Sequence, residues 1–569
     1  MTFSRLRLNP TAAALGVVLG VYSWLAFFYL PAGVYWTPDV GLKRIQAANV
    51  RWDAGLDLSL DYPGRALDPA LRFLPFRENF YYIHQGRVRF SQPPVIAVLS
   101  RPLLAWFGPR GEPVMALIAG LVCAWLTARL ARSVGAEPAW PAALLAGLAT
   151  PLMVYSPFLW EHTLGAALAL GAVVIVFEAR VEWPRAALAG LLLGLAGAVR
   201  KELLLLAPVL LMVMGRRGRR LGAACAGAFG LPLLAWWAYA FAASGHPVPP
   251  EFRISTTPGL TSLAYFWHAG LGLPADFVFD PRYGGLGDAL LLAVVAYALV
   301  GWKMPAPWRD LIQAAALAAL LAGAWLNRAE PLASGALFGL LSASPFLALA
   351  WAGPLAPPAR TLRSAAGAYY ALTALALGVM TPAGPYLSGL EWGARYSLLA
   401  FPLAAPPAWL ALRQVWERAR TPGQWAARIH FALAVGLSLW SGVWMLTGVS
   451  RMRQPTVDAG TRAALLALAE PAVVTNLWWL SAAAPDLYLT RPLFLVDSDE
   501  DLRAWLAAAR DARITGFVFV SYAPLSEGVA AGLAPPDVRL EIEETRLLPN
   551  GMTAGRFTLT DSRQDWPAP

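Results

Sequence analysis

Two carboxylates of this chain follow long apolar runs, a position from which they could carry out acid–base chemistry. Asp39 comes just after the first apolar run, and Glu161 follows a later run that ends in Pro157-Phe158-Leu159-Trp160. A carboxylate in such a place can take the proton of a hydroxyl group that acts as a nucleophile. Both residues are therefore candidate catalytic groups. For Asp39 a structural role is the alternative, because Pro38-Asp39 also suits the capped start of a helix over residues 41–51.

Three charged residues, Arg200, Lys201 and Glu202, interrupt the apolar stretch of residues 186–215. As one helix this stretch would be roughly 45 Å long, which exceeds a hydrocarbon core of about 30 Å. We expect a hairpin whose short arms leave the three charges recessed below the outer surface. Ionisable groups so placed are candidates for substrate binding, and a guanidinium can hold a phosphate through two hydrogen bonds. The alternative is an Arg–Glu pair that satisfies itself.

A second arginine and a histidine extend this set of polar groups. Arg395 lies in the stretch of residues 392–396, at the mouth of the helix that follows, and is either a ligand for phosphate or sugar or an interface anchor. His162 adjoins Glu161, and an imidazole beside a carboxylate can position an acceptor, bind a divalent metal or satisfy a helix end. If a metal is bound, its candidate ligands are Asp39, Glu161 and His162.

Aromatic side chains accompany these charged residues. The loop of residues 32–94 is long for a chain whose other loops are short, and such loops are usually functional. It carries Tyr81 and Tyr82, which together with Trp392 would suit stacking on a sugar ring. Aromatic residues are also common at membrane interfaces, so both roles stay open for these three.

The composition indicates the class of protein whose fold must position these residues. Of the 569 residues 57% are hydrophobic and 14% are charged, which excludes a purely soluble domain. The net charge of +10 comes from arginines and lysines in short clusters between apolar runs, the distribution expected of cytoplasmic loops and not of a nucleic-acid-binding surface. Cys123 and Cys225, the two cysteines, offer no disulfide framework. The chain is predicted to be a mainly α, polytopic membrane protein.

The positions of the basic clusters predict the topology. They favour about 13 crossings, with a retained first anchor, a cytoplasmic N-terminus and an extracytoplasmic C-terminus, in a bacterial-type inner membrane. Residues 95–107 are too short to cross and carry Arg101 in their middle, so we expect an interfacial or re-entrant helix. With this topology, the candidate residues Asp39, Glu161, Arg200 and Arg395 all fall on the outer side of the membrane.

The composition changes after residue 450. Residues 472–475, 493–496 and 516–521 have the apolar character of short buried strands, and residues 499–510 form a helical pattern with acidic residues at its start. We therefore divide the chain into a membrane domain, residues 1–450, and a small extracytoplasmic α/β domain, residues 451–569.

The membrane part resembles the GT-C superfamily of membrane glycosyltransferases, among them protein O-mannosyltransferases and lipid A aminoarabinose transferases. The resemblance is carried by a first crossing and a long outer loop that opens with Asp39, by Gln92-Pro93-Pro94, by the stretch from Gly194 through residues 200–202 to Pro208, and by residues 392–396. Departures are Val40, where many members have a second acidic residue, Lys201, where the common motif has proline, and Leu480, which follows Trp478-Trp479 in place of an aspartate.

The resemblance implies an enzyme that uses a polyprenyl-phosphate sugar and needs no nucleotide at the outer face. Asp39 would be the general base of an inverting displacement, and Arg200 and Arg395 would hold the phosphate with help from Lys201. The partners expected are the lipid bilayer, the lipid-linked donor and an envelope glycan, lipid or protein as acceptor, without nucleic acid. A metal requirement stays open. The alternative function is a transporter or flippase of a lipid-linked or small solute, for which polar residues through the membrane depth would be typical.

Overall fold

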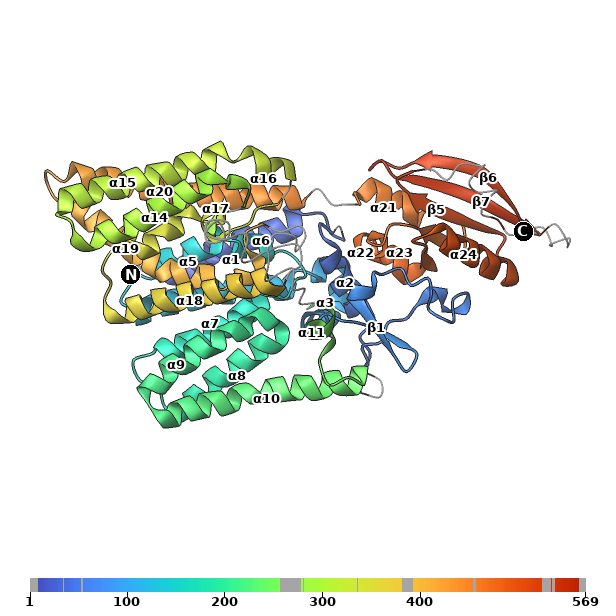
Figure 1. Cartoon of the computed structure of the whole chain (residues 1–569), viewed down its shortest axis with the longest axis horizontal. Coiled ribbons are helices and arrows are strands. Elements are labelled where there is room, and N and C mark those ends of the chain that lie inside the picture. The colour runs from blue at the N-terminus through green and yellow to red at the C-terminus, as the bar shows by residue number, and fades with distance from the viewer. Residues whose placement is uncertain are drawn as a thin grey trace, which may run out of the picture. The chain divides into compact units, whose positions relative to one another are not determined.

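The structure, a computed structural model, describes residues 9–33, 35–52, 55–255, 278–279, 281–334, 336–380, 392–453, 457–523, 534 and 538–561. Its elements form two compact units (Figure 1). Unit 1 comprises Met1–Leu30, Pro113–Ala242 and His246–Met452, and unit 2 comprises Pro31–Glu112, Ala243–Gly245 and Arg453–Pro569. Each unit is described by itself below.

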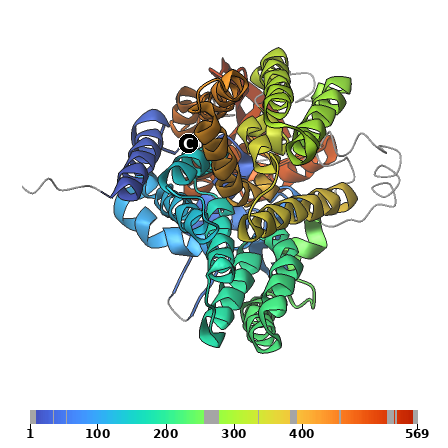
Figure 2. The ribbon, with the colours of Figure 1, turned by 90° about the vertical axis from the view of Figure 1, so that its left-hand side faces the viewer.

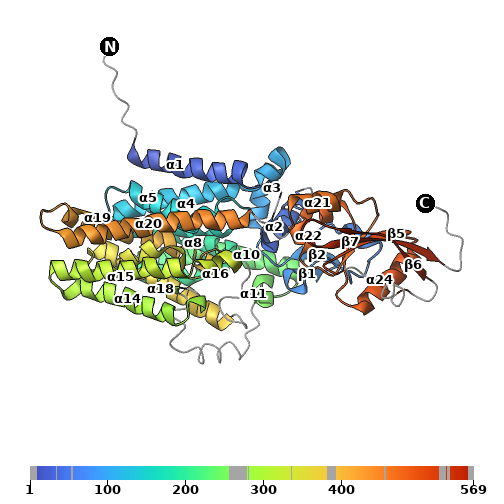
Figure 3. The same ribbon diagram turned by 90° about the horizontal axis from the view of Figure 1, so that it is seen from above.

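Unit 1 is built from helices. The longer ones are α1 (Pro10–Trp24), α4 (Val114–Ser133), α5 (Trp140–Leu148), α7 (His162–Phe177), α8 (Trp183–Val199), α9 (Ala207–Arg217), α10 (Arg219–Ser244), α14 (Gly285–Lys303), α15 (Ala306–Leu326), α18 (Pro357–Met380), α19 (Ala400–Ala419) and α20 (Trp425–Met452). Short helical segments include α6 (Leu152–Tyr155), α11 (Pro250–Ser255), α16 (Ala329–Ser334) and α17 (Leu340–Ala343). In Figure 3, α14 and α15 run side by side, with α20 along α15.

Five helices in the described part of the chain are long and apolar enough to cross a membrane. They are Pro10–Tyr29, Val114–Ser133, Arg219–Ser244, Pro307–Ser334 and Trp425–Met452, and shorter apolar helices cover His162–Phe177, Trp183–Val199 and Gly285–Val300. The chain is therefore a multi-pass membrane protein, as predicted. The number of crossings and the side on which each terminus lies stay predictions.

Small residues bring two helices of unit 1 into close contact. A Cβ atom on Gly190 would stand 2.0 Å from the carbonyl oxygen of Cys225, and one on Gly194 would stand 2.3 Å from that of Phe229. Helices α8 and α10 thus approach through glycines four residues apart, a spacing that drives helix association in membranes. Figure 2 shows α7 to α10, coloured teal to green, grouped together within the unit.

The helical chain breaks where the charged residues were expected to interrupt it. Helix α8 ends at Val199, and Arg200 has an extended backbone with φ −146° and ψ 112°. A 3-10 helix, Lys201–Leu206, follows and leads into α9. The stretch is thus not a single helix, which confirms that part of the prediction.

Unit 2 contains a five-stranded mixed sheet. Its strands are β3 (Val473–Thr475), β4 (Leu493–Leu495), β5 (Gly516–Ser521), β6 (Val538–Leu547) and β7 (Thr553–Asp561), in the order β4-β3-β5-β7-β6. Strands β4, β3 and β5 are parallel, and β7 pairs antiparallel with both β5 and β6. The predicted strands and helix α24 (Asp499–Asp511) are confirmed, whereas β6 and β7 were not predicted. The short helices α21 (Ala459–Leu466), α22 (Leu480–Ala483) and α23 (Pro485–Thr490) complete this part.

The long first loop packs into the same unit. It forms α2 (Pro38–Ala48), the hairpin of β1 (Tyr81–His84) and β2 (Arg87–Phe90), and α3 (Val95–Phe107), which matches the helix predicted over residues 95–107. One hydrophobic core joins the loop to the C-terminal residues: Phe76 lies 5.0 Å from Tyr488 and Tyr62 lies 6.2 Å from Phe494, between ring centroids. The sequence-based division assigned residues 32–94 to the membrane domain. Their apolar side chains are instead buried against residues 453–561.

A partly buried network of charges also joins the segments of unit 2. Arg44 on α2 lies 3.0 Å from Glu112 and 3.9 Å from Asp486. The hydroxyl of Tyr35 donates a hydrogen bond of 2.8 Å to Glu112, and Arg462 on α21 contacts Asp486 and donates to the carbonyl oxygen of Gly33. The residues that follow the first helix, α2, the residues before α4 and the C-terminal part are thus joined by paired charges.

Candidate active site

Asp39 lies in the first turn of α2, within unit 2. The helix begins with Pro38, and Thr37 occupies the N-cap position, so Asp39 is not the cap itself. A carboxylate in the first turn interacts favourably with the partial positive charge of a helix N-terminus. The side chain is half-buried, and the amide Nε2 of Gln92 donates a hydrogen bond of 3.2 Å to Oδ1 of Asp39. The carboxylate is therefore fixed in position while it keeps access to solvent.

Two further side chains on the same face of α2 hold the segment that carries Gln92. Lys43 is completely buried and its Nζ donates to the carbonyl oxygen of Pro93 at 2.6 Å, while Nε2 of Gln46 donates to that of Gln92 at 3.2 Å. Residues four and seven positions after Asp39 share its helix face. The motif Gln92-Pro93-Pro94 thus positions Asp39. Lys43 and Gln46 were not predicted as positioning residues, although their spacing along α2 was a signal available in the sequence.

In unit 1 the predicted charged residues form a buried cluster. Nη1 of Arg200 lies 2.9 Å from Glu161 and its Nε lies 2.7 Å from Glu202. Glu161 precedes α7, and Arg200 and Glu202 stand at the break between α8 and α9. Glu161 is 2% exposed and Glu202 is 9% exposed. Burying such charges is costly unless they are paired, and the two carboxylates flank the guanidinium of Arg200.

Arg395 joins this cluster through aromatic rings. Its guanidinium lies 5.1 Å from the ring centroid of Trp160 and 4.8 Å from that of Tyr396, and its Nη2 donates a hydrogen bond of 3.0 Å to the hydroxyl of Tyr396. The guanidinium of Arg200 lies 5.4 Å from the same Tyr396 ring. His162 contacts the cluster as well, with Nδ1 3.8 Å from Glu202. Two guanidiniums are thus gathered around one tyrosine in a largely buried place.

The remaining predicted residues lie elsewhere. Lys201 donates to the carbonyl oxygen of Glu251 at 3.0 Å and lies over the ring of Phe252. Trp392 is completely buried, and its indole nitrogen donates to the carbonyl oxygen of Trp444 at 3.2 Å.

The two tyrosines predicted to stack on sugar belong to the hairpin of the first loop. Tyr81 and Tyr82 lie on β1 in unit 2, and both are half-buried. Their stacking role stays a prediction.

The residues around Glu161 fit a divalent metal poorly. The guanidinium of Arg200, 2.9 Å away, competes with a cation for the same carboxylate. In the described ranges, no group of three or more histidine, cysteine, aspartate or glutamate side chains could hold a metal ion. The candidate ligand set Asp39, Glu161 and His162 comes from both units, and its role stays a prediction.

The sequence and the structure were compared with those of known proteins. No protein-family model matches the sequence, and no curated protein is significantly similar to it. Among solved structures, ArnT from Cupriavidus metallidurans bound to undecaprenyl phosphate aligns over 96% of this chain and 97% of its own, with 13% identity and a TM-score of 0.51. The apo structure of that ArnT gives 12% identity and the same TM-score over the same shares.

A second solved protein is similar to a lesser degree. The archaeal oligosaccharyltransferase AglB from Archaeoglobus fulgidus, in complex with an inhibitory peptide and a dolichol-phosphate, has 12% identity and a TM-score of 0.43, over 91% of this chain and 70% of its own. The likeness to ArnT covers nearly the whole of both chains. The chain therefore has the GT-C fold of membrane glycosyltransferases, which confirms the expected fold.

Proposed function

We propose that this chain is an integral-membrane glycosyltransferase that moves a sugar from a polyprenyl-phosphate donor to an acceptor hydroxyl at the extracytoplasmic face. The observation that carries the proposal is the buried cluster of Glu161, Arg200, Glu202 and Arg395 within a GT-C fold. Buried ionisable groups in a membrane protein are costly and mark functional sites. The ArnT structure with this fold was solved with undecaprenyl phosphate bound, which supports a polyprenyl phosphate as the lipid.

In the proposed reaction the acceptor oxygen attacks the anomeric carbon in a single displacement. The new glycosidic bond forms as the bond between the anomeric carbon and the phosphate oxygen breaks, and the configuration inverts. Asp39 takes the proton of the acceptor hydroxyl, and the polyprenyl phosphate leaves with the electron pair of the broken bond. The half-buried carboxylate, held by Gln92, has the fixed geometry and the access that a general base needs.

Two roles are proposed for the buried cluster. Arg395 binds the donor phosphate, since a guanidinium offers several donors in one plane and its aromatic neighbours Trp160 and Tyr396 orient it. Arg200, which lies between Glu161 and Glu202, adds positive charge and keeps the two carboxylates in place. A fixed charge in a water-poor site stabilises a developing phosphate anion strongly, because it does not need to reorganise.

The test is a transfer assay in nanodiscs with a panel of radiolabelled polyprenyl-phosphate sugars and extracted envelope material as acceptor. The proposal predicts that one donor passes its label to a product that no longer extracts with the lipid. A chain that binds a donor and carries it across the bilayer without a covalent product would instead be a transporter. Label that stays on the lipid with every donor would contradict the transferase.

A further inference from the structure

Unit 2 contains a cavity that the proposed reaction does not use. It has a volume of about 650 Å³ and lies between the first loop and the C-terminal sheet, at the carboxyl end of strand β4. The first loop reaches this strand through a hydrogen bond from the backbone nitrogen of Leu495 to the carbonyl oxygen of Phe73. Ligands of α/β sheets commonly bind at the carboxyl ends of parallel strands, and β4 is parallel to β3.

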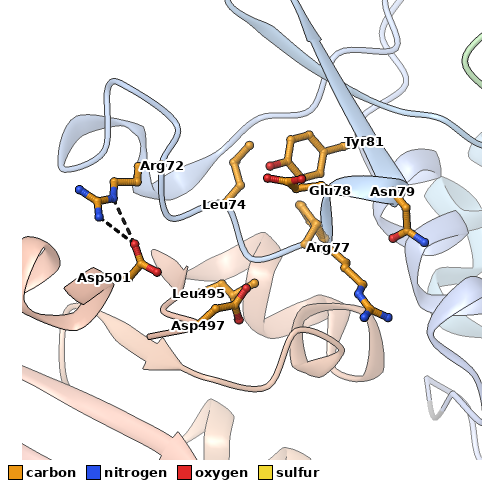
Figure 4. A pocket seen from close by; sticks show the side chains of 10 residues that line it. Arg72, Leu74, Arg77, Glu78, Asn79, Tyr81, Leu495, Asp497 and Asp501 are labelled. Carbon is orange, nitrogen blue, oxygen red and sulfur yellow. Dashed lines mark hydrogen bonds and ion pairs between the residues drawn. The ribbon is translucent and has the colours of Figure 1, made fainter. Parts of the chain in front are cut away.

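The lining of this cavity combines an apolar base with polar walls. Leu74, Phe76 and Leu495 are buried and contribute the apolar part. Figure 4 shows Glu78 and Tyr81 on the side of the first loop, and Asp497 with Leu495 on the side of the sheet. An apolar surface with an aromatic ring and a few convergent polar groups is typical of small-molecule sites, and 650 Å³ lies in their usual size range of about 300–1,000 Å³.

The charges facing the cavity are unbalanced. Arg72 is engaged by Asp501, with Nη2 2.9 Å from the carboxylate, and Arg77 lies over the ring of Trp478 at 5.2 Å. In the described part of the chain, neither Glu78 nor Asp497 has a hydrogen bond or an ion pair from its side chain. Burial raises the pKa of Asp497, and the carboxylates of Asp501 and Glu78 raise it further. The guanidinium of Arg77 lowers this pKa but does not cancel the rise. The lining therefore carries three carboxylates against two guanidiniums, which is a net negative charge.

We propose that this cavity is a second saccharide-binding site of the chain, selective for a sugar that carries a protonated amine. Glu78 and Asp497 pair with the ammonium group, and the amide of Asn79 bonds to hydroxyls. The ring of Tyr81 and the side chains of Leu74 and Leu495 pack against the apolar face of the pyranose ring. The proposal rests on unit 2 alone and does not depend on the transfer reaction.

Other ligand classes match this lining less well. A phosphate or a uronic acid would meet more negative than positive charge here, because Arg72 is engaged by Asp501 and Arg77 alone opposes the like charges of Glu78 and Asp497. A metal ion needs more convergent ligands, and the described residues offer no group of three or more that could hold one. A lysine of a peptide would satisfy the carboxylates but would leave the apolar base uncovered, because its stem is narrow.

The experiment measures binding to the full chain in nanodiscs. The probes are the glucosamine trimer, its fully N-acetylated form and a galacturonic acid trimer. We expect the glucosamine trimer to bind about tenfold or more tightly than the acetylated form, and the galacturonic acid trimer to bind most weakly. The variant Glu78→Gln with Asp497→Asn keeps the shape of the cavity and should remove the preference for the amine. Glu541→Gln, which changes an exposed carboxylate on β6, should bind like the wild type.

Because Glu78 and Asp497 are exposed, the double variant should unfold at the wild-type temperature, which thermal unfolding checks. Glu78→Lys provides a second test and should abolish binding of the glucosamine trimer. Unchanged binding in both variants would place the ligand elsewhere. The proposal would be overturned if the galacturonic acid trimer bound more tightly than the glucosamine trimer, or if no trimer bound. It would also be overturned if an oligolysine peptide bound while no sugar did. Sugar transfer can fail without affecting any of these results.

Discussion

At the scale of single residues, burial decides how a carboxyl group ionises. Glu112 is 6% exposed, and this burial raises its pKa from the usual range to about 7, although Tyr35, Arg44 and Arg462 all favour the charged form. The group therefore binds its proton more tightly in the folded chain than in the unfolded one. Between the two pKa values the folded state holds more protons, so this residue lowers the free energy of unfolding as the pH rises.

We predict that Glu112→Gln removes this part of the pH dependence. The wild type should lose about 3 kcal/mol of unfolding free energy from Glu112 between about pH 4.5 and about pH 7, and the loss should level off above that. The measurement is the thermal unfolding of both proteins across this pH range, taken as the difference between them so that other carboxylates cancel. Parallel curves would show that Glu112 does not titrate in this way, and Glu541→Gln serves as an exposed control.

The members of the buried cluster in unit 1 could be named from the sequence, but the contacts between them could not. A charge within an apolar run pointed to Arg200, and charges beside the ends of such runs pointed to Glu161 and Arg395, because burying a charge in a membrane is costly. Which carboxylate pairs with which guanidinium depends on residues 39 positions apart in the chain, as for Glu161 and Arg200, and no spacing rule gives that. The same limit applies to Trp392, whose indole packs against Gly448 and is buried.

At the scale of elements, close helix packing in unit 2 depends on one glycine. A Cβ atom on Gly41 in α2 would stand 1.5 Å from the carbonyl oxygen of Ala482 in α22. Backbone cannot move aside as a flexible side chain can, so the two helices would have to separate. Helix α2 also carries Asp39, so its packing bears on the position of the proposed base.

We predict that Gly41→Ala destabilises the chain by about 1–3 kcal/mol or more, as overpacking does in other cores. The readout is the temperature of thermal unfolding in nanodiscs. Gly16→Ala is the matched control, since nothing lies within 4 Å of a Cβ atom there and alanine favours a helix over glycine. Equal unfolding temperatures for the two variants would mean that α2 and α22 can move apart without cost.

In unit 2, the buried strands β3, β4 and β5 could be predicted from the sequence and the exposed strand β6 could not. Residues 516–521 form an apolar run that becomes the central strand β5, buried along most of its length. Strand β6, at one edge of the sheet, instead carries Arg539, Glu541 and Glu544 and is mostly exposed. Strand β4, at the other edge, is buried and hydrogen-bonds to the first loop. An edge strand with much of its surface in water lacks the apolar run that identifies a buried one.

At the scale of the whole molecule, composition and charge predicted the class of protein, and long-range packing determined the units. The apolar runs and the basic clusters were sufficient for a multi-pass membrane protein, whereas the GT-C fold was expected from the resemblance of short motifs such as Gln92-Pro93-Pro94. The division at residue 450 missed that the first loop shares a core with the C-terminal part, through pairs such as Tyr62 and Phe494. Such pairs are more than 400 residues apart, and their apolar side chains carry no sign of their partner.

The measurement that tests the central claim most directly compares wild type with Asp39→Asn in nanodiscs, recording sugar transfer and binding of the polyprenyl-phosphate sugar on the same preparation. Asparagine keeps the size of the side chain but cannot take a proton. We predict that the variant binds the donor as tightly as the wild type and loses transfer by about 100-fold or more, the usual contribution of a general base. Transfer at the wild-type rate in the folded variant would contradict the role of Asp39.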